Sequence, residues 1–144
     1  MIEAVTVYIT ASSDDEARRL ATGLIQSRLV ACVNILGKID SVFYWGGSIQ
    51  RESEVALVAK ALRSDFAAIN GKVRELHSYD CPCIVAWPII EADVEFLQWV
   101  ADETRGKRRP PAPATSTTST PATSTTSTPA TPIPPADTAD ADPV

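Results

Sequence analysis

The sequence has few of the residues that build disulfide frameworks, metal clusters or membrane spans. It contains three cysteines, an odd number, and one histidine among 144 residues. An odd set of cysteines without a secretion signal favours reduced thiols in the cytoplasm over a disulfide framework. No segment has the run of about 18 apolar residues that a membrane-spanning helix needs, so we expect no membrane partner.

Basic residues are also scarce, with 13 Lys and Arg against 18 Asp and Glu and a net charge of −5. Contacts with nucleic-acid phosphates need clustered Lys and Arg, so the composition argues against nucleic acid as a partner. A short basic run at residues 107–109 follows a predicted helix end, where the helix dipole favours positive charge. The first nine residues lack the basic segment of a signal peptide and are typical of a strand.

Hydrophobic periodicity predicts one domain over residues 1–105, with four strands and three helices. The predicted strands cover residues 3–10, 29–45 with an interruption at 37–38, 54–61 and 83–87. The predicted helices begin near Ser13, where Glu16 completes a capping box, near Phe66 and at Asp93. The order βαββαβ predicts an α+β, ferredoxin-like fold with an antiparallel sheet, followed by an extra C-terminal helix.

The predicted strands are apolar on both faces. Residues 55–59 and 84–87 show little alternation, although the two main helices of this fold cover only one side of the sheet. We therefore expect a second copy of the chain to cover the other side. The run Phe43, Tyr44 and Trp45 lies near a predicted hairpin tip, where it packs either within one chain or, as we prefer, as an interface anchor.

The remaining residues, 106–144, predict a disordered tail rich in Ser, Thr and Pro. Nine of the eleven prolines follow Arg109, whereas all nine aromatic residues precede it. Residues 113–120 are repeated without change at 121–128. Such low-complexity sequence has almost nothing apolar to bury. A glycosylated stalk would have this composition too, but we find no secretion signal to support it.

The densest set of potential metal ligands is His77, Cys81 and Cys83, with Asp80 between them. Two thiolates and one imidazole suit Cu(I) or Zn(II), and side chains two residues apart point the same way in an extended chain. The alternative is that the cysteines fill buried positions and the histidine is structural. There is no glycine-rich phosphate loop and no second histidine, so we predict no catalytic residues and no enzyme.

Several landmarks recur in an order and spacing that resemble the CutA divalent-cation tolerance family. They are VYITA at residues 7–11, RLVACVN at 28–34, FYW at 43–45, Glu54, HSYDCP at 77–82 and DVEFLQW at 93–99. The resemblance implies a ferredoxin-like fold, a homotrimer, a cytoplasmic location and a role in tolerance of copper and other divalent metal ions. It also implies that His77 matches a copper ligand of the family.

Other ligand positions of the family differ here, since Ile9 replaces a cysteine and Leu76 replaces a histidine. The alternative function is a small-molecule-sensing trimer similar to the nitrogen-regulatory P-II signalling proteins, which share the architecture. Those proteins have a long loop between the middle strands and basic residues for nucleotide phosphates, whereas the connection predicted here is short. An acylphosphatase of the same fold needs an arginine in the loop after the first strand, which reads Thr10 to Ser13 here.

The composition of the tail yields a first prediction. Deleting residues 106–144 should leave the melting temperature nearly unchanged, because the segment has no hydrophobic periodicity with which to pack. Thermal denaturation of the full and shortened chains, followed by circular dichroism, measures the difference. A loss of many degrees would mean that the tail packs on the domain.

Overall fold

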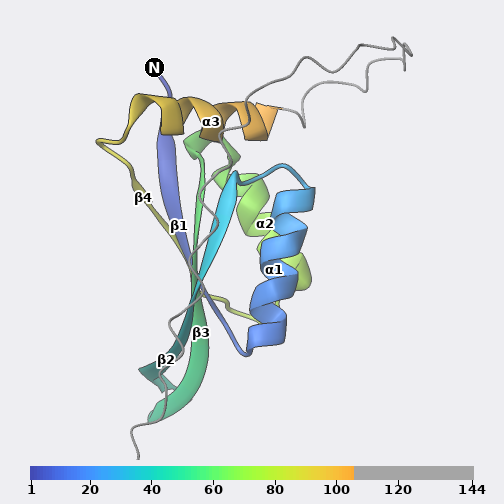
Figure 1. Cartoon of the computed structure of the whole chain (residues 1–144). Helices are drawn as coiled ribbons and strands as arrows, with labels where there is room; N and C mark the ends of the chain where they lie inside the picture. Colours follow the sequence, from blue (N-terminus) through green and yellow to red (C-terminus); the bar gives the residue numbers. More distant parts are fainter. Residues whose placement is uncertain (106–144) are drawn as a thin grey trace, which may run out of the picture. The chain divides into compact units, whose positions relative to one another are not determined.

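The computed structural model describes residues 1–105, which form a four-stranded sheet and three α-helices (Figure 1). The elements are β1 (Ala4–Ala11), α1 (Asp14–Gln26), β2 (Cys32–Trp45), β3 (Ser48–Leu62), the 3-10 turn η1 (Arg63–Asp65), α2 (Phe66–Leu76), β4 (Ile84–Pro88) and α3 (Val94–Arg105). The predicted α+β, ferredoxin-like order with an extra C-terminal helix is confirmed. The predicted tail, residues 106–144, lies outside the described residues.

The strands are ordered β2-β3-β1-β4, and each neighbouring pair is antiparallel. Helices α1 and α2 lie side by side on one face of the sheet, and α3 crosses one end of it (Figure 1). None of the helices in residues 1–105 is long and apolar enough to span a membrane. Because α1 and α2 lie on the same face (Figure 1), the opposite face of the sheet has no such helix layer, as the predicted fold requires.

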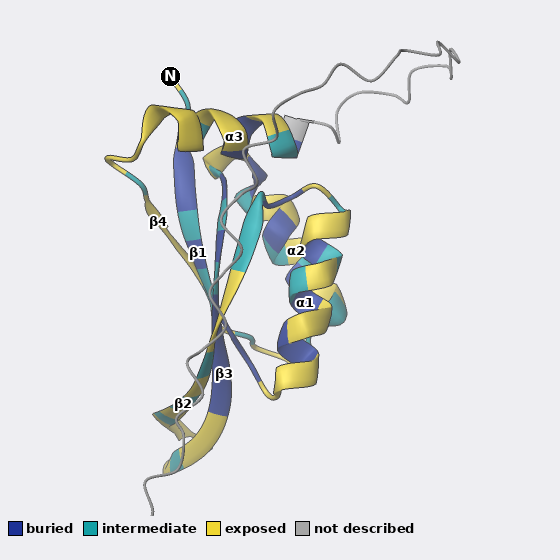
Figure 2. Cartoon of the chain, viewed as in Figure 1, coloured by how far each residue is buried: buried dark blue, intermediate teal, exposed yellow. Residues whose placement is uncertain are grey.

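The core fills the space between the sheet and the two helices that cover it (Figure 2). Val7 and Ile9 of β1 point inward and are completely buried, as are Leu57 of β3, Leu24 of α1 and Ile69 of α2. Because successive strand residues point to opposite faces, Tyr8 and its partner Val85 lie on the face that the helices leave uncovered. This uncovered face is the second surface that the sequence pattern predicted.

The prediction was wrong about the bounds of the second strand. It begins at Cys32 and not at Leu29. Leu29 donates its backbone N–H to Leu24 in α1 at 3.2 Å, and Arg28 adopts a φ of 55°, so this stretch completes the helix end. Leu29 and Val30 are nevertheless buried, which explains an apolar run that is not a strand.

The middle strands form the hairpin that the sequence predicted, but β2 runs through the predicted interruption at residues 37–38 and β3 is longer than predicted. β2 continues past Gly37, whose φ of 111° accommodates a bulge beside Ile35. β3 begins at Ser48 and not at Glu54, because its first residues pair with the end of β2. The turn is made by Gly46 and Gly47, both with positive φ, as a two-residue hairpin favours. We call residues 42–51 the hairpin arm; its tip extends well beyond the helices (Figure 1).

Candidate functional site

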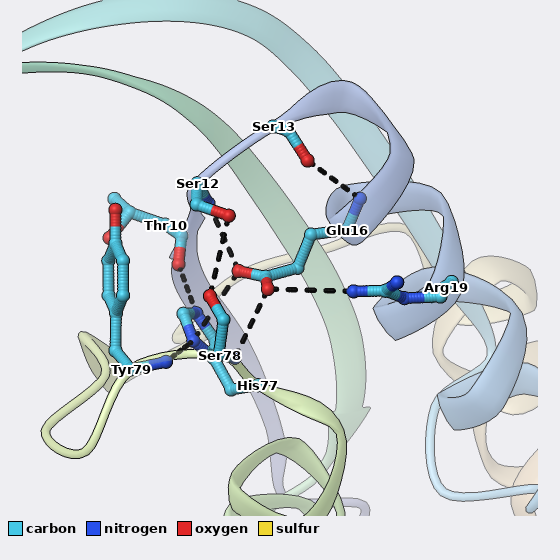
Figure 3. Close-up of polar contacts among 8 residues, drawn as sticks. All are labelled: Thr10, Ser12, Ser13, Glu16, Arg19, His77, Ser78 and Tyr79. Atoms are coloured by element: carbon cyan, nitrogen blue, oxygen red, sulfur yellow. Dashed lines mark hydrogen bonds and ion pairs between the residues drawn. The ribbon is translucent and has the colours of Figure 1, made fainter.

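His77, the first predicted ligand, is the residue that ends α2, and its side chain is fully buried. Its Nε2 lies 2.7 Å from the carbonyl oxygen of Thr10, which can only accept, so Nε2 carries the proton and donates. Its Nδ1 accepts the backbone N–H of Tyr79 at 3.0 Å (Figure 3). Both ring nitrogens are therefore engaged, and the ring is the neutral tautomer protonated on Nε2.

Glu16, in the first turn of α1, has a buried side chain that joins two loops (Figure 3). Its Oε1 accepts the backbone N–H of Ser12 at 3.0 Å, and its Oε2 accepts the backbone N–H of Ser78 at 3.1 Å. Arg19 lies 3.6 Å from Oε2 and faces solvent. One carboxylate thus fixes the turn before α1 against the segment that follows α2.

The charge of Glu16 is stabilised in this position. Burial on its own raises the pKa of the Glu16 carboxyl, but the hydrogen bonds from Ser78 and Ser12 outweigh it and hold the pKa below its ordinary value. Nδ1 of His77 lies 3.4 Å from Oε1 of Glu16. Because Nδ1 already accepts from Tyr79, this approach adds no hydrogen bond between His77 and Glu16.

The predicted capping box at the start of α1 is confirmed in one half. Ser13 accepts the backbone N–H of Glu16 through its side-chain oxygen at 3.1 Å. The returning bond from Glu16 goes to the N–H of Ser12, one residue earlier than the motif predicts. The sequence indicated a local cap, but it gave no sign that the same carboxylate also binds Ser78, 62 residues away.

Cys81 and Cys83, the other predicted ligands, are exposed free cysteines in the segment that leads into β4. Partial burial of the sulfur and the nearby Glu54 carboxylate raise the pKa of the Cys83 thiol, although a hydrogen bond with Thr10 offsets part of this effect. Cys83 is therefore a protonated thiol at neutral pH, and a metal ion would have to displace its proton. Cys32 opens β2 and is half-buried.

The three predicted ligands do not form a ready ligand set. Within residues 1–105, no three His, Cys, Asp or Glu side chains gather closely enough to hold a metal ion. His77 faces the interior with both nitrogens bonded, whereas Cys81 and Cys83 lie at the surface. The metal site at His77, Cys81 and Cys83 stays a prediction.

The uncovered face of the sheet and the hairpin arm carry large apolar side chains, and β4 and the tip of the hairpin are mostly exposed (Figure 2). Tyr8 and Trp87 stack with ring centroids 6.1 Å apart, and Trp87 is still 47% exposed. On the hairpin arm, Tyr44 and Ile49 are 71% and 72% exposed. Isolated apolar residues at a surface are ordinary, whereas groups of exposed aromatic and aliphatic side chains such as these, one on the uncovered face and one on the hairpin arm, indicate interaction surfaces.

Comparison with known proteins gives a family match over most of the described residues. The model of the family described as CutA1 divalent ion tolerance protein matches residues 5–103. A relative from Archaeoglobus fulgidus, named divalent-cation tolerance protein CutA, is 45% identical over 98 residues, which are 68% of this chain and 94% of the relative.

Solved structures of the same kind are similar to this chain. The structure of the periplasmic divalent cation tolerance protein CutA from Archaeoglobus fulgidus has a TM-score of 0.69 and 40% identity, covering 70% of this chain and 98% of its own. The crystal structure of CutA1 from Oryza sativa has a TM-score of 0.71 and 35% identity, covering 72% and 95% respectively.

The contacts of Glu16 yield a prediction about stability and pH. Glu16→Gln should lower the free energy of unfolding at neutral pH by about 1–3 kcal/mol, because an amide cannot accept from both backbone N–H groups. A folded-state pKa below the ordinary 4.5 means that the carboxylate stabilises the fold above that pH. Its contribution is then lost as the pH falls through the folded-state value.

Urea denaturation at several pH values measures this effect. The gap between the two proteins should narrow as the solution is acidified from neutral pH. Glu91→Gln, which changes an exposed carboxyl, should show no such gap. A gap of constant size at every pH would contradict the role assigned to the charge.

Proposed function

The chain belongs to the CutA1 divalent ion tolerance protein family, and from this we propose that it is a homotrimeric, non-catalytic protein of the cellular response to divalent metal ions. The observation that carries the proposal is the uncovered apolar face of the sheet together with the hairpin arm. An isolated chain would leave these aromatic side chains in water, and copies of the same chain are the simplest cover.

The arrangement of the strands supports self-association. β2 and β4 are the two edges of the sheet, so each has backbone groups without a strand partner within residues 1–105. The hairpin arm places an exposed stretch of β2 beyond the helices, where another copy has access to it (Figure 1). The number of three copies comes from the family resemblance.

The P-II-like sensor has less support than the metal-response function. β2 and β3 are joined by the turn at Gly46 and Gly47 and not by a long loop. Arg51, close to this turn, is paired across the hairpin with Val42, and the tip itself carries no basic side chain. A nucleotide phosphate would find few donors there.

Metal binding is the second part of the proposal. Cys81 and Cys83 are exposed, lie two residues apart and flank Pro82, so two sulfurs are available to one Cu(I) or Zn(II) ion. His77 lies four residues before Cys81, but it would have to give up its bonds with Thr10 or Tyr79 to join them. We therefore expect the two thiolates to supply most of the affinity.

We place this activity in the cytoplasm. Cys32, Cys81 and Cys83 are all free thiols, which suits a reducing compartment. Relatives are named for other compartments, since the solved structure from Archaeoglobus fulgidus is titled periplasmic and the relative from Oryza sativa is named chloroplastic. Fractionation of cells that express the full chain tests the assignment.

The proposed trimer predicts the mass of the protein in solution. Sedimentation equilibrium of the full chain at micromolar concentration should give three times the mass of one chain. Trp45→Ala should weaken association by about 2 kcal/mol or more, because a large aromatic anchor at an interface is lost. Ile25→Ala, which removes an exposed apolar side chain from α1, is the control and should leave the trimer intact. A well-folded monomer would rule out the trimer.

The proposed metal site predicts the affinity for Cu(I). In a competition titration under reducing conditions, Cys81→Ser and Cys83→Ser should each weaken binding about tenfold or more, equivalent to about 1.4 kcal/mol. Cys32→Ser is the matched control and should bind like the parent. His77→Ala should weaken binding less than either and also lower the melting temperature, because it breaks buried hydrogen bonds. Equal binding by both Cys variants and the parent would place the site elsewhere or exclude it.

A further inference from the structure

A groove runs between α1 and α2 on the outer side of the helix layer. α1 lines it with Arg18, Arg19, Thr22 and Gln26, and α2 lines it with Lys72 and Leu76. The inward side of α1 consists of other residues, such as Leu20 and Leu24, which are completely buried in the core. The groove has a volume of about 460 Å³, within the range of about 300–1,000 Å³ typical of small-molecule sites.

The groove is basic although the chain as a whole is acidic. Arg18, Arg19 and Lys72 line it and no carboxylate does, whereas the chain carries a net charge of −5. Three positive side chains from two helices thus meet at one small concavity. Such a concentration of positive charge attracts anions from solution.

The carboxylates near the groove leave these cations largely free to bind. Within residues 1–105, Arg18 has no ion pair. Arg19 lies 3.6 Å from Glu16, and Lys72 lies 3.5 Å from Glu75. These two cations are therefore ion-paired. Because a guanidinium has five N–H donors and an ammonium has three, each keeps donors for a ligand beyond the one that faces its carboxylate.

The close approach of the two helices adds apolar surface to the groove. A Cβ at Gly23 would lie 2.6 Å from Cδ1 of Leu76, so the glycine allows Leu76 to pack directly against α1. Gly23 and Leu76 both line the groove, as do Thr22 and Gln26. A ligand that fits this lining has an anionic group and a carbon skeleton.

We propose that this groove binds a small organic phosphate, with the phosphate dianion held by Arg18, Arg19 and Lys72 and the carbon skeleton against Gly23 and Leu76. Arginine and lysine donors form short, charge-assisted hydrogen bonds with phosphate oxygens. A polymeric nucleic acid fits poorly, because three cations on an acidic chain cannot neutralise a run of phosphates. The groove is lined by α1 and α2, which cover the opposite face of the sheet from the uncovered one (Figure 1), so it shares no residue with the proposed trimer surface or metal site.

The test is an NMR titration of the ¹⁵N-labelled full chain with phenyl phosphate, with inorganic phosphate as a second probe. Phenyl phosphate should cause saturable shifts in residues 18–27 and 72–76. Arg18→Ala and Lys72→Ala should each weaken binding about tenfold, since each removes a charged donor. Arg63→Ala, which removes a surface arginine paired only loosely with Glu3, is the matched control and should bind like the parent.

Inorganic phosphate should bind more weakly than phenyl phosphate, because it has no skeleton to contact Gly23 and Leu76. If the shifts do not saturate by about 10 mM phenyl phosphate, the affinity is too weak for a specific site and the proposal is overturned. Shifts that map outside α1 and α2, or equal affinities of the Arg18→Ala and Arg63→Ala variants, would also overturn it. Equal binding of the two probes would overturn the assignment of an organic ligand. The melting temperature of each variant shows whether it is folded.

Discussion

The hydrogen bonds of the Glu16 carboxylate hold together the end of the domain where α1 begins and α2 ends. The carboxylate accepts backbone N–H groups from both the turn before α1 and the segment after α2, and these two loops have no regular secondary structure to hold them together. His77 adds a second link from the same segment to β1 through Thr10. These partly buried bonds fix the start of the loop that carries Cys81 and Cys83 toward β4.

A second constraint comes from a sheet with two apolar faces and helices for only one of them. The helix layer satisfies the inner face, where Ile9 and Leu57 are completely buried. The outer face and the hairpin arm leave Tyr44 and Trp87 in contact with water in the single chain. The inner face is thus covered within the chain and the outer face is not, while the basic groove lies between α1 and α2. These surfaces consist of different residues.

The order of the elements could be predicted from the sequence because periodicity and capping residues are local signals. Ser13 and Asp93 cap α1 and α3 as expected, with Asp93 accepting the N–H of Phe96 at 3.0 Å. The bounds of β2 and β3 could not be predicted, since strand pairing across the hairpin determined them. The buried position of His77 could not be predicted from the sequence either, because it depends on a contact with Thr10, 67 residues away. A ligand-like spacing at residues 77–83 therefore could not reveal that both ring nitrogens were already bonded.

The hairpin arm also has a consequence for the history of each newly made chain. The two paired strands extend past the helices, are rich in aromatic and β-branched residues, and have an open edge. Such an edge is a template to which another extended segment can add. In the proposed trimer, assembly of matching copies would therefore compete with non-specific strand addition, and the rate of assembly would depend on chain concentration. Under that proposal, the supply of new chains, and not only the stability of the core, determines how much of the protein escapes aggregation.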